Sequence, residues 1–208
     1  MVKCKLRIYM CVMVCYVMLL ASCATTEIKS VWSDASYKGG PLIKVAVIGL
    51  AKDQTMKRLY EDEFVRQLKA HGVQAIPGYS VIPQDKMGDE NYISEKMKEL
   101  GVDATLITRL VDKKTIQTYY PPEVYYTPAP YYRGWHGYYR NSYQYMVSPG
   151  YTTTEEALVL ETNIYSMQSN QLIWSALSET FTGGSSESLI YSLVQKLIKD
   201  MAAKDLIP

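Results

Sequence analysis

The chain has 208 residues, of which 22 are Lys or Arg and 21 are Asp or Glu, and 48% of its residues are hydrophobic. This length fits one domain, and the hydrophobic share is enough for a buried core. The net charge is +1, and it becomes about −2 without the three basic residues near the start, so the charge gives no reason to expect nucleic acid or an anionic membrane surface as a partner.

Residues 1–22 have the features of an export signal. Three basic residues stand near the start, an uncharged apolar run covers residues 8–20, and two small residues precede Cys23. This order predicts a secretory signal peptide. The apolar run is shorter than the roughly 20 residues that a membrane-spanning helix needs.

The segment Leu20-Ala21-Ser22-Cys23 resembles the lipobox of bacterial lipoproteins. The resemblance implies that Cys23 is the first mature residue and carries the lipid, which attaches the protein to the membrane. The alternative is an ordinary signal peptide with a cysteine nearby. Ala24 stands where an Asp commonly marks retention at the inner membrane in such families. We therefore expect the outer membrane, with the domain on its periplasmic face.

Cleavage before Cys23 leaves 186 residues, with 19 basic against 21 acidic side chains. The other three cysteines are removed with the signal, so the mature domain has no disulfide and no Cys-ligated zinc. Residues 23–40 are polar and are expected to form a tether that spans about 20–25 Å on average. Trp32 and Tyr37 argue against complete disorder there, because aromatic side chains usually pack on something.

Hydrophobic periodicity after residue 41 predicts one α/β domain over residues 41–208, with α+β mixed character. The expected order is β-α-β-α-β, an insertion, then β-β-α, forming a mixed sheet in a two-layer or three-layer domain. The predicted elements are strands over 43–50, 73–76, 102–118, 155–165 and 171–181, with helices over 55–71, 91–100 and from Ser185 or Ser186 to Met201.

The insertion at residues 119–151 is the most unusual stretch of the domain. It holds 11 of the 19 tyrosines, five of the nine prolines and three charged residues. It lies at the tip of a predicted hairpin, and loops of this length are usually functional or disordered. A recognition surface for a sugar, peptide or protein, a loosely packed flexible excursion and contact with lipid headgroups all fit this composition. The candidate binding residues are Tyr125, Tyr126, Tyr131, Tyr132, Trp135, Tyr138 and Tyr139.

Residues able to support catalysis are few. His71 lies at a predicted helix C-terminus, where the helix dipole favours it. His136 lies in the insertion without a neighbouring metal ligand. Gly49 follows the first strand of the predicted domain, but neither phosphate-binding glycine pattern is present around it.

Arg58, Glu61 and Asp62 have helix-neighbour spacing, and the two acids have the look of a catalytic carboxylate pair. Solvated ion pairing on a helix face explains them better. We therefore expect no catalytic residue, no bound metal and no cofactor. An enzymatic function would require a pocket around Arg58, Glu61 or His136.

Five segments and the Tyr-rich insertion resemble a group of uncharacterised Gram-negative lipoproteins. These segments are Trp32, Lys44–Gly49, Arg58–Phe64, Gly72–Ala75 and Leu172–Ser175. The element order is more distantly similar to the TolB amino-terminal domain and to the curli-secretion channel lipoproteins. The likeness implies a periplasmic assembly role and no known activity. The prolines and tyrosine pairs of the insertion depart from clean lipid-facing alternation, so pore formation is not implied.

The sequence therefore predicts a lipid-anchored periplasmic protein of non-enzymatic character. Its aromatic insertion is expected to bind a partner protein or a glycan of the envelope. The alternative is a subunit of an oligomeric outer-membrane secretion or channel assembly.

Overall fold

The computed structural model describes residues 26–121, 135–137, 139–140 and 150–208. The predicted signal peptide and Cys23 lie outside these residues. The elements are β1 (Thr26–Ser33), β2 (Lys44–Leu50), α2 (Gln54–Ala70), β3 (Gln74–Pro77), η1 (Gly78–Ser80), η2 (Gln84–Lys86), α3 (Glu90–Leu100), β4 (Ala104–Tyr120), β5 (Tyr151–Ser166), β6 (Leu172–Phe181) and α5 (Ser186–Ala203).

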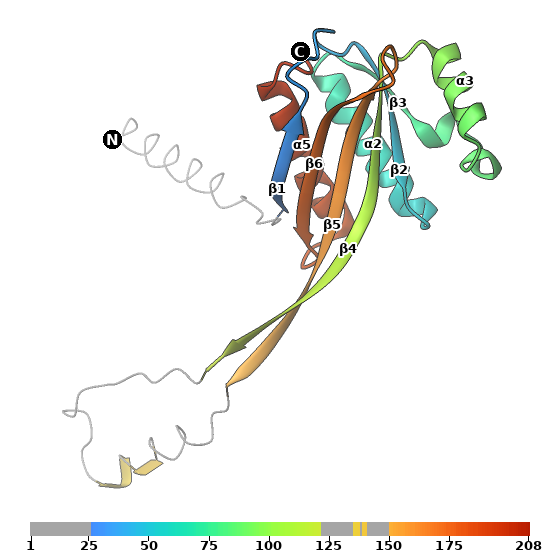
Figure 1. Ribbon diagram of the computed structural model, residues 1–208. Coiled ribbons are helices and arrows are strands. Elements are labelled where there is room, and N and C mark those ends of the chain that lie inside the picture. Colours follow the sequence, from blue (N-terminus) through green and yellow to red (C-terminus); the bar gives the residue numbers. More distant parts are fainter. Residues whose placement is uncertain (1–25, 122–134, 138, 141–149) are drawn as a thin grey trace, which may run out of the picture.

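The six strands form one mixed sheet in the order β1-β6-β5-β4-β2-β3 (Figure 1). β2 pairs in parallel with β3 and β4, whereas β4, β5, β6 and β1 pair antiparallel. The predicted α/β class with a mixed sheet is confirmed. The run of apolar residues in β2 is buried on both faces, as expected for a parallel strand covered by helices.

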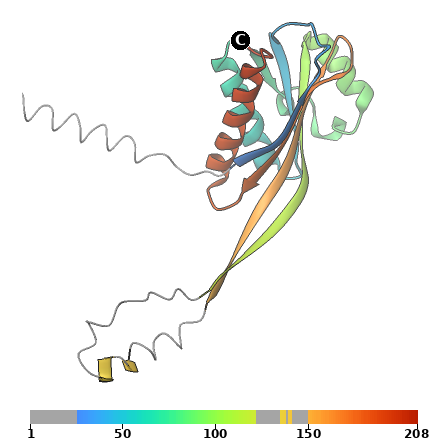
Figure 2. The same ribbon diagram turned by 60° about the vertical axis from the view of Figure 1, so that its left-hand side comes forward.

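Helices α2 and α5 cover one face of the sheet, and α3 lies on the other face beside β2 (Figure 2). The main core between the sheet, α2 and α5 contains fully buried Trp174 and Phe64. A smaller cluster under α3 includes Met97 and Ile48. Among the described residues, no helix is long and apolar enough to cross a membrane.

The predicted tether is wrong over residues 26–33, because this segment is the edge strand β1 of the sheet. It pairs antiparallel with β6 from Thr26 to Ser33, and Ile28 and Val31 pack on the main core. A bulge between Ile28 and Ser30 interrupts the alternation of side chains. With only two apolar residues packed on the core and a break in register, β1 has no clear period of two in its sequence.

Thr26 fixes the beginning of β1 to the domain. Its side chain is 2% exposed, its hydroxyl lies 3.0 Å from that of Thr180, and Lys196 of α5 donates to its carbonyl oxygen. Tyr37, in the loop that follows β1, also packs on the main core. The tether therefore contains a structured strand and an aromatic anchor point.

The β4–β5 hairpin is longer than the sequence predicts. Its ladder extends to the pair Tyr120–Tyr151, inside the predicted insertion. The partner strand β6 stops earlier, where Phe181 pairs with Ala157. Beyond that pair the hairpin is a two-stranded ribbon that protrudes from the domain (Figure 1). We call residues 115–120 and 151–156 the distal ribbon.

We expect the backbone amides of β1 that face β6 to be protected from hydrogen–deuterium exchange. A flexible tether exchanges rapidly, whereas a paired strand exchanges only when the strand opens. The measurement is exchange resolved by peptide over residues 26–33, with the exposed Gly183–Gly184 segment as the fast reference. Equal, fast exchange in both segments would contradict β1 as a strand.

Candidate functional site

The crevice at the carboxyl ends of β2 and β3 is the position where a sheet of this kind usually binds a ligand. β2 lies between β3 and β4 in the sheet, while α2 and α3 cover opposite faces. Chain connections diverge at this point, and open α/β sheets usually bind ligands there. Gly49 near the end of β2 and Tyr79 in η1 after β3 bring backbone N–H groups to the crevice.

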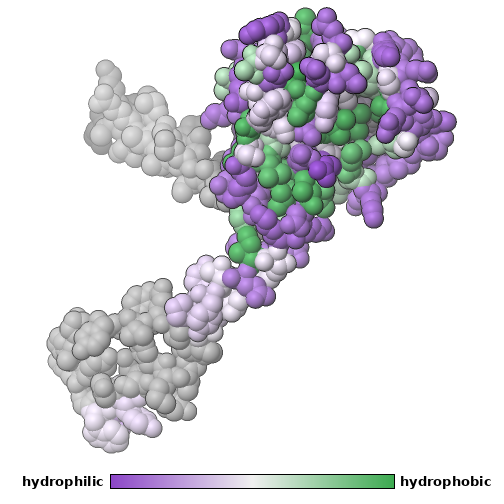
Figure 3. All heavy atoms as spheres, viewed as in Figure 1, coloured by the Kyte–Doolittle hydropathy of each residue, from purple (hydrophilic) through white to green (hydrophobic). Residues whose placement is uncertain are grey.

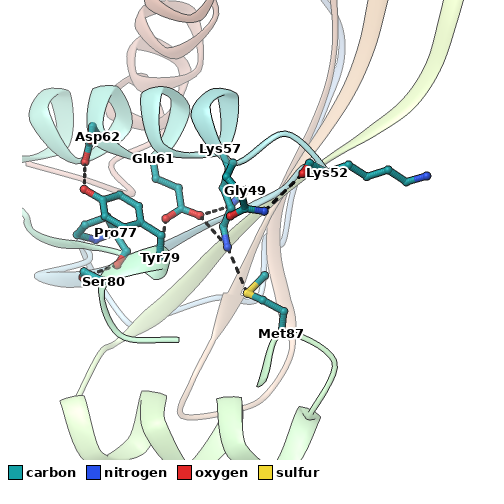
Figure 4. A network of polar contacts seen from close by, with 10 residues as sticks. Gly49, Lys52, Lys57, Glu61, Asp62, Pro77, Tyr79, Ser80 and Met87 are labelled. Carbon is teal, nitrogen blue, oxygen red and sulfur yellow. Dashed lines mark hydrogen bonds and ion pairs between the residues drawn. The ribbon is translucent and has the colours of Figure 1, made fainter. Parts of the chain in front are cut away.

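Glu61 of α2 fills this crevice with its own carboxylate (Figure 4). One carboxylate oxygen accepts a hydrogen bond from the Gly49 N–H at 2.9 Å, and the other accepts from the Tyr79 N–H at 2.8 Å. The side chain is fully buried, at 0% exposure. Gly78 lets the turn after β3 lie close to β2, because a Cβ at position 78 would be only 2.9 Å from the carbonyl oxygen of Val47. The Glu61 carboxylate therefore accepts hydrogen bonds from the backbone N–H groups that bind an anionic ligand in other α/β proteins.

A buried lysine completes the network around Glu61. The Lys57 ammonium lies 4.0 Å from a Glu61 oxygen and donates to the sulfur of Met87 at 3.2 Å (Figure 4). Burial raises the pKa of Glu61, while the N–H groups of Gly49 and Tyr79 and the Lys57 charge oppose that rise. The arrangement ties α2 to the end of β2 and to the segment that leads into α3.

The prediction of solvated ion pairing is wrong for Glu61. Glu61 is buried and pairs with buried Lys57, whereas Arg58 and Asp62 are exposed. Asp62 accepts the hydroxyl of Tyr79 at 2.6 Å, and the Arg58 guanidinium lies 5.4 Å from the centre of the same ring. The sequence held a signal for the burial of Glu61, since Glu61 falls on the apolar stripe of α2, three residues before Phe64.

The two histidines take no part in this network. His71 caps the C-terminus of α2, as predicted, with its Nδ1 3.3 Å from the carbonyl oxygen of Pro208. His136 lies against Trp135, with 3.6 Å between ring centres. Within the described ranges no three His, Cys, Asp or Glu residues gather in a way that could hold a metal.

A shallow hollow of about 510 Å³ lies at the other end of the sheet, away from the ribbon. Its lining includes Tyr37, Lys98 and Asp103. The Asp103 carboxylate already accepts the backbone N–H groups of Ile43 and Lys44, at 2.9 and 2.7 Å. The hollow is therefore lined by a group that holds the β1–β2 loop in place, and Arg58, Glu61 and His136 do not line it.

The distal ribbon is the second candidate site, and its aromatic side chains face solvent. Tyr119, Tyr120 and Tyr151 are 45 to 62% exposed. Tyr120 and Tyr151 stack across the strands, with ring centres 5.0 Å apart and planes 16° apart. Tyr119 is paired with Thr152 and, by strand alternation, points to the opposite face. Both faces of the ribbon end therefore present aromatic rings.

The end of the ribbon carries no charged side chain. Residues 117–120 and 151–154 consist of Gln, Thr and Tyr, and the flanking charges are Lys114, Glu155 and Glu156. Thr and Tyr favour β-structure, and cross-strand pairs of this kind stabilise a ladder. Beyond Glu156, whose carbonyl oxygen accepts from the N–H and the hydroxyl of Thr182, each strand has one paired edge and one free edge, because β6 no longer accompanies β5.

Two of the predicted binding residues are described, and both are exposed: Trp135 and Tyr139. The remaining five lie outside the described residues: Tyr125, Tyr126, Tyr131, Tyr132 and Tyr138. The binding residues predicted from the sequence do not include the exposed Tyr119, Tyr120 and Tyr151. The signal for including them was the Thr-rich, alternation-compatible run on both sides of the insertion, which is typical of paired strands.

No protein-family model matches the chain, and no curated protein matches it in sequence. Among solved structures, the fold is similar to a dodecamer of a PelC variant from Paraburkholderia phytofirmans, at 13% identity and a TM-score of 0.44. That match covers 88% of this chain and 99% of PelC. A second PelC dodecamer from the same organism has 12% identity over 84% of this chain and 95% of PelC, with a TM-score of 0.44.

Lipoprotein GNA1162 from Neisseria meningitidis is similar at 13% identity and a TM-score of 0.42, over 77% of this chain and 99% of GNA1162. Likeness at these scores carries no argument about what the chain binds or how it assembles. The candidate sites therefore depend on the geometry described above.

We expect Glu61→Ala to lower the free energy of unfolding by about 3 to 5 kcal/mol, because it leaves a buried lysine and two buried N–H groups without their partner. Urea unfolding followed by circular dichroism measures the change. The matched control is Glu99→Ala in α3, whose carboxylate forms an exposed pair with Lys96 and whose loss should leave stability nearly unchanged. Equal, small effects of both variants would contradict a structural role for Glu61.

Proposed function

We propose that the protein is a lipid-anchored envelope protein of non-enzymatic character, held by Cys23 at the periplasmic face of the outer membrane. Its contact surface is the aromatic end of the β4–β5 hairpin, which binds a partner protein or a glycan. The observation that carries the proposal is the group of exposed tyrosines on a ribbon that protrudes from the domain.

The exposed tyrosines contribute nothing to the core of the domain. The core between the sheet, α2 and α5 contains none of the distal ribbon residues. Exposed aromatic side chains gathered at one place are typical of interaction surfaces. Tyrosine suits such a surface because it combines an apolar ring with a polar hydroxyl at low entropic cost.

The crevice at the ends of β2 and β3 supports a non-enzymatic role. The Glu61 carboxylate already binds the N–H groups of Gly49 and Tyr79 there. A buried carboxylate with these partners stabilises the fold, and a catalytic carboxylate instead needs access to substrate. The Glu61 carboxylate, which the sequence offers as a catalytic candidate, thus has its hydrogen bonds within the fold.

We expect Tyr119→Ser together with Tyr151→Ser to reduce recovery of the partner from cell-envelope fractions. The loss of two exposed rings removes contact area without opening the core. Quantitative pull-down with the lipidated protein measures recovery, and deletion of residues 129–146 is the companion variant. Tyr191→Ser in α5 is the control, since Tyr191 is comparably exposed but lies away from the ribbon. Unchanged recovery of the partner with both the double serine variant and the deletion variant would contradict the proposal.

A subunit role in an oligomeric secretion or channel assembly is the second candidate. Two observations favour it: the free edges of the distal ribbon and an apolar area on the sheet face opposite α2 and α5 (Figure 3). Trp32 is exposed, and strand alternation places the half-buried Leu177 and Phe181 on the same face. Free strand edges and apolar faces are surfaces on which further copies can add.

Light scattering of the detergent-solubilised lipidated protein separates the two candidates. If the protein is an assembly subunit, we expect a discrete particle of several copies that Trp32→Lys reduces to smaller species, because a charge then faces the apolar contact. A monodisperse single copy at all concentrations would remove the assembly proposal. The control is Ile43→Lys, an exposed apolar residue outside the sheet face.

A further inference from the structure

The position of the first strand limits how far the domain stands from its anchor. Thr26 is buried and fixed to Thr180 and Lys196, so the chain is part of the folded domain from that residue onward. Only three peptide steps separate Thr26 from Cys23. Fully extended, three residues span at most about 11 Å. Given the lipid at Cys23, on which this inference rests, the start of β1 lies within about this distance of the membrane surface.

The ribbon leaves the domain at the same end as the anchor. β1 begins where Thr26 pairs with Thr180, and Thr180 pairs on its other side with Leu158 of β5. The strand β5 continues from Leu158 back to Tyr151, away from the domain, as the two views of the ribbon show (Figures 1 and 2). At about 3.3 Å per residue, this stretch of seven residues reaches about 23 Å beyond the level of Thr26.

The ribbon is thus about twice as long as the reach of the anchor segment. When the end of the sheet that carries Thr26 faces the bilayer, the segment between Cys23 and Thr26 is too short to hold the ribbon clear of the membrane. In this orientation the ribbon meets lipid. We propose that the distal ribbon lies in the headgroup layer of the membrane that carries the anchor.

The side chains at the end of the ribbon suit the headgroup layer. Tyrosine is enriched at this depth because its ring is apolar and its hydroxyl can reach water. Tyr119, Tyr120 and Tyr151 are exposed, and the Thr and Gln residues between them are uncharged. The charged residues Glu155 and Glu156 lie at the domain end of the ribbon, and Lys114 lies just before it, so in this arrangement they are at the aqueous edge of the headgroup layer.

The backbone of a single ribbon keeps it out of the hydrocarbon core. Each strand of the distal ribbon has one free edge, whose N–H and C=O groups have no partner strand. Such groups cost several kcal/mol each in hydrocarbon, but water satisfies them among the headgroups. The headgroup layer accommodates both the rings and these polar edges. The partner bound by the hairpin, as proposed above, is then a component lying in or on the same membrane.

Depth-dependent fluorescence quenching tests this placement. The sequence after Cys23 has no cysteine, so Thr152→Cys gives a unique labelling site beside Tyr119 without removing any tyrosine. The acylated protein, labelled with an environment-sensitive dye, is reconstituted into phosphatidylethanolamine–phosphatidylglycerol vesicles. The vesicles contain nitroxide lipids labelled either at the headgroup or at the acyl-chain centre. Gln168→Cys, in the exposed turn between β5 and β6 at the opposite end of the hairpin strand, is the matched control.

We expect headgroup nitroxides to quench the dye at residue 152 several-fold more than the dye at residue 168, and chain-centre nitroxides to quench neither. Adding Tyr119→Ser and Tyr151→Ser should reduce the quenching at residue 152. Quenching mainly from the chain centre overturns the headgroup placement, as does an absence of quenching. A shielded but unquenched dye also overturns it and favours a protein contact.

Mass spectrometry and flotation of the same samples separate this inference from the proposed function. An unacylated Cys23, or a protein that does not float with the vesicles, overturns the anchor and the headgroup placement together. A floating, acylated protein with an unquenched ribbon overturns only the headgroup placement.

Discussion

The pairing of β1 with β6 is the constraint on which the rest of the molecule depends. It converts a polar segment into the edge of the sheet and buries Thr26 against Thr180. The same pairing determines which end of the sheet the N-terminal segment leaves, and this is the end from which the β4–β5 hairpin protrudes. The start of β1 and the ribbon are placed at the same end of the sheet by one edge strand, although more than 80 residues separate them in the sequence.

The fold also shows how an α/β domain loses its usual ligand site. The end of β2 and the turn after β3 present N–H groups in the geometry that suits an anion. Glu61 satisfies them from within, and its burial is made possible by Lys57 and by the glycine at position 78. A buried carboxylate and ammonium carry a large desolvation cost, so their retention points to a specific alignment of α2 with the sheet.

The sequence predicts most of the regular elements, because their apolar residues recur with periods of two or 3.6. It does not predict β1, since a bulge and a polar composition hide the period of that strand. It also misplaces Glu61, because the charge of this residue suggests the surface while its position lies on the buried stripe of α2. Charge alone does not predict whether a residue is buried where a helix packs a salt bridge against the end of a strand.

The length of the hairpin illustrates a different limit of sequence interpretation. Proline and tyrosine content indicated an insertion at residues 119–151, yet Tyr119, Tyr120 and Tyr151 belong to the strands. Tyrosine and threonine have high β-propensity, so composition that suggests a loop is equally compatible with a ladder when prolines lie only beyond it. The boundary becomes visible only from the register of the two strands.

A two-stranded hairpin in water is marginally stable without a third strand or a packed face. The distal ribbon has neither among the described residues, and its stacked pair Tyr120–Tyr151 is half exposed. Its threonine and tyrosine pairs favour the ladder, but they leave aromatic surface and strand edges open. A surface that covers the aromatic rings and still hydrates the strand edges removes the cost of exposed apolar area without leaving backbone N–H and C=O groups unsatisfied. In the arrangement proposed above, the membrane interface has these two properties, and the ribbon and the proposed anchor then act as one functional unit.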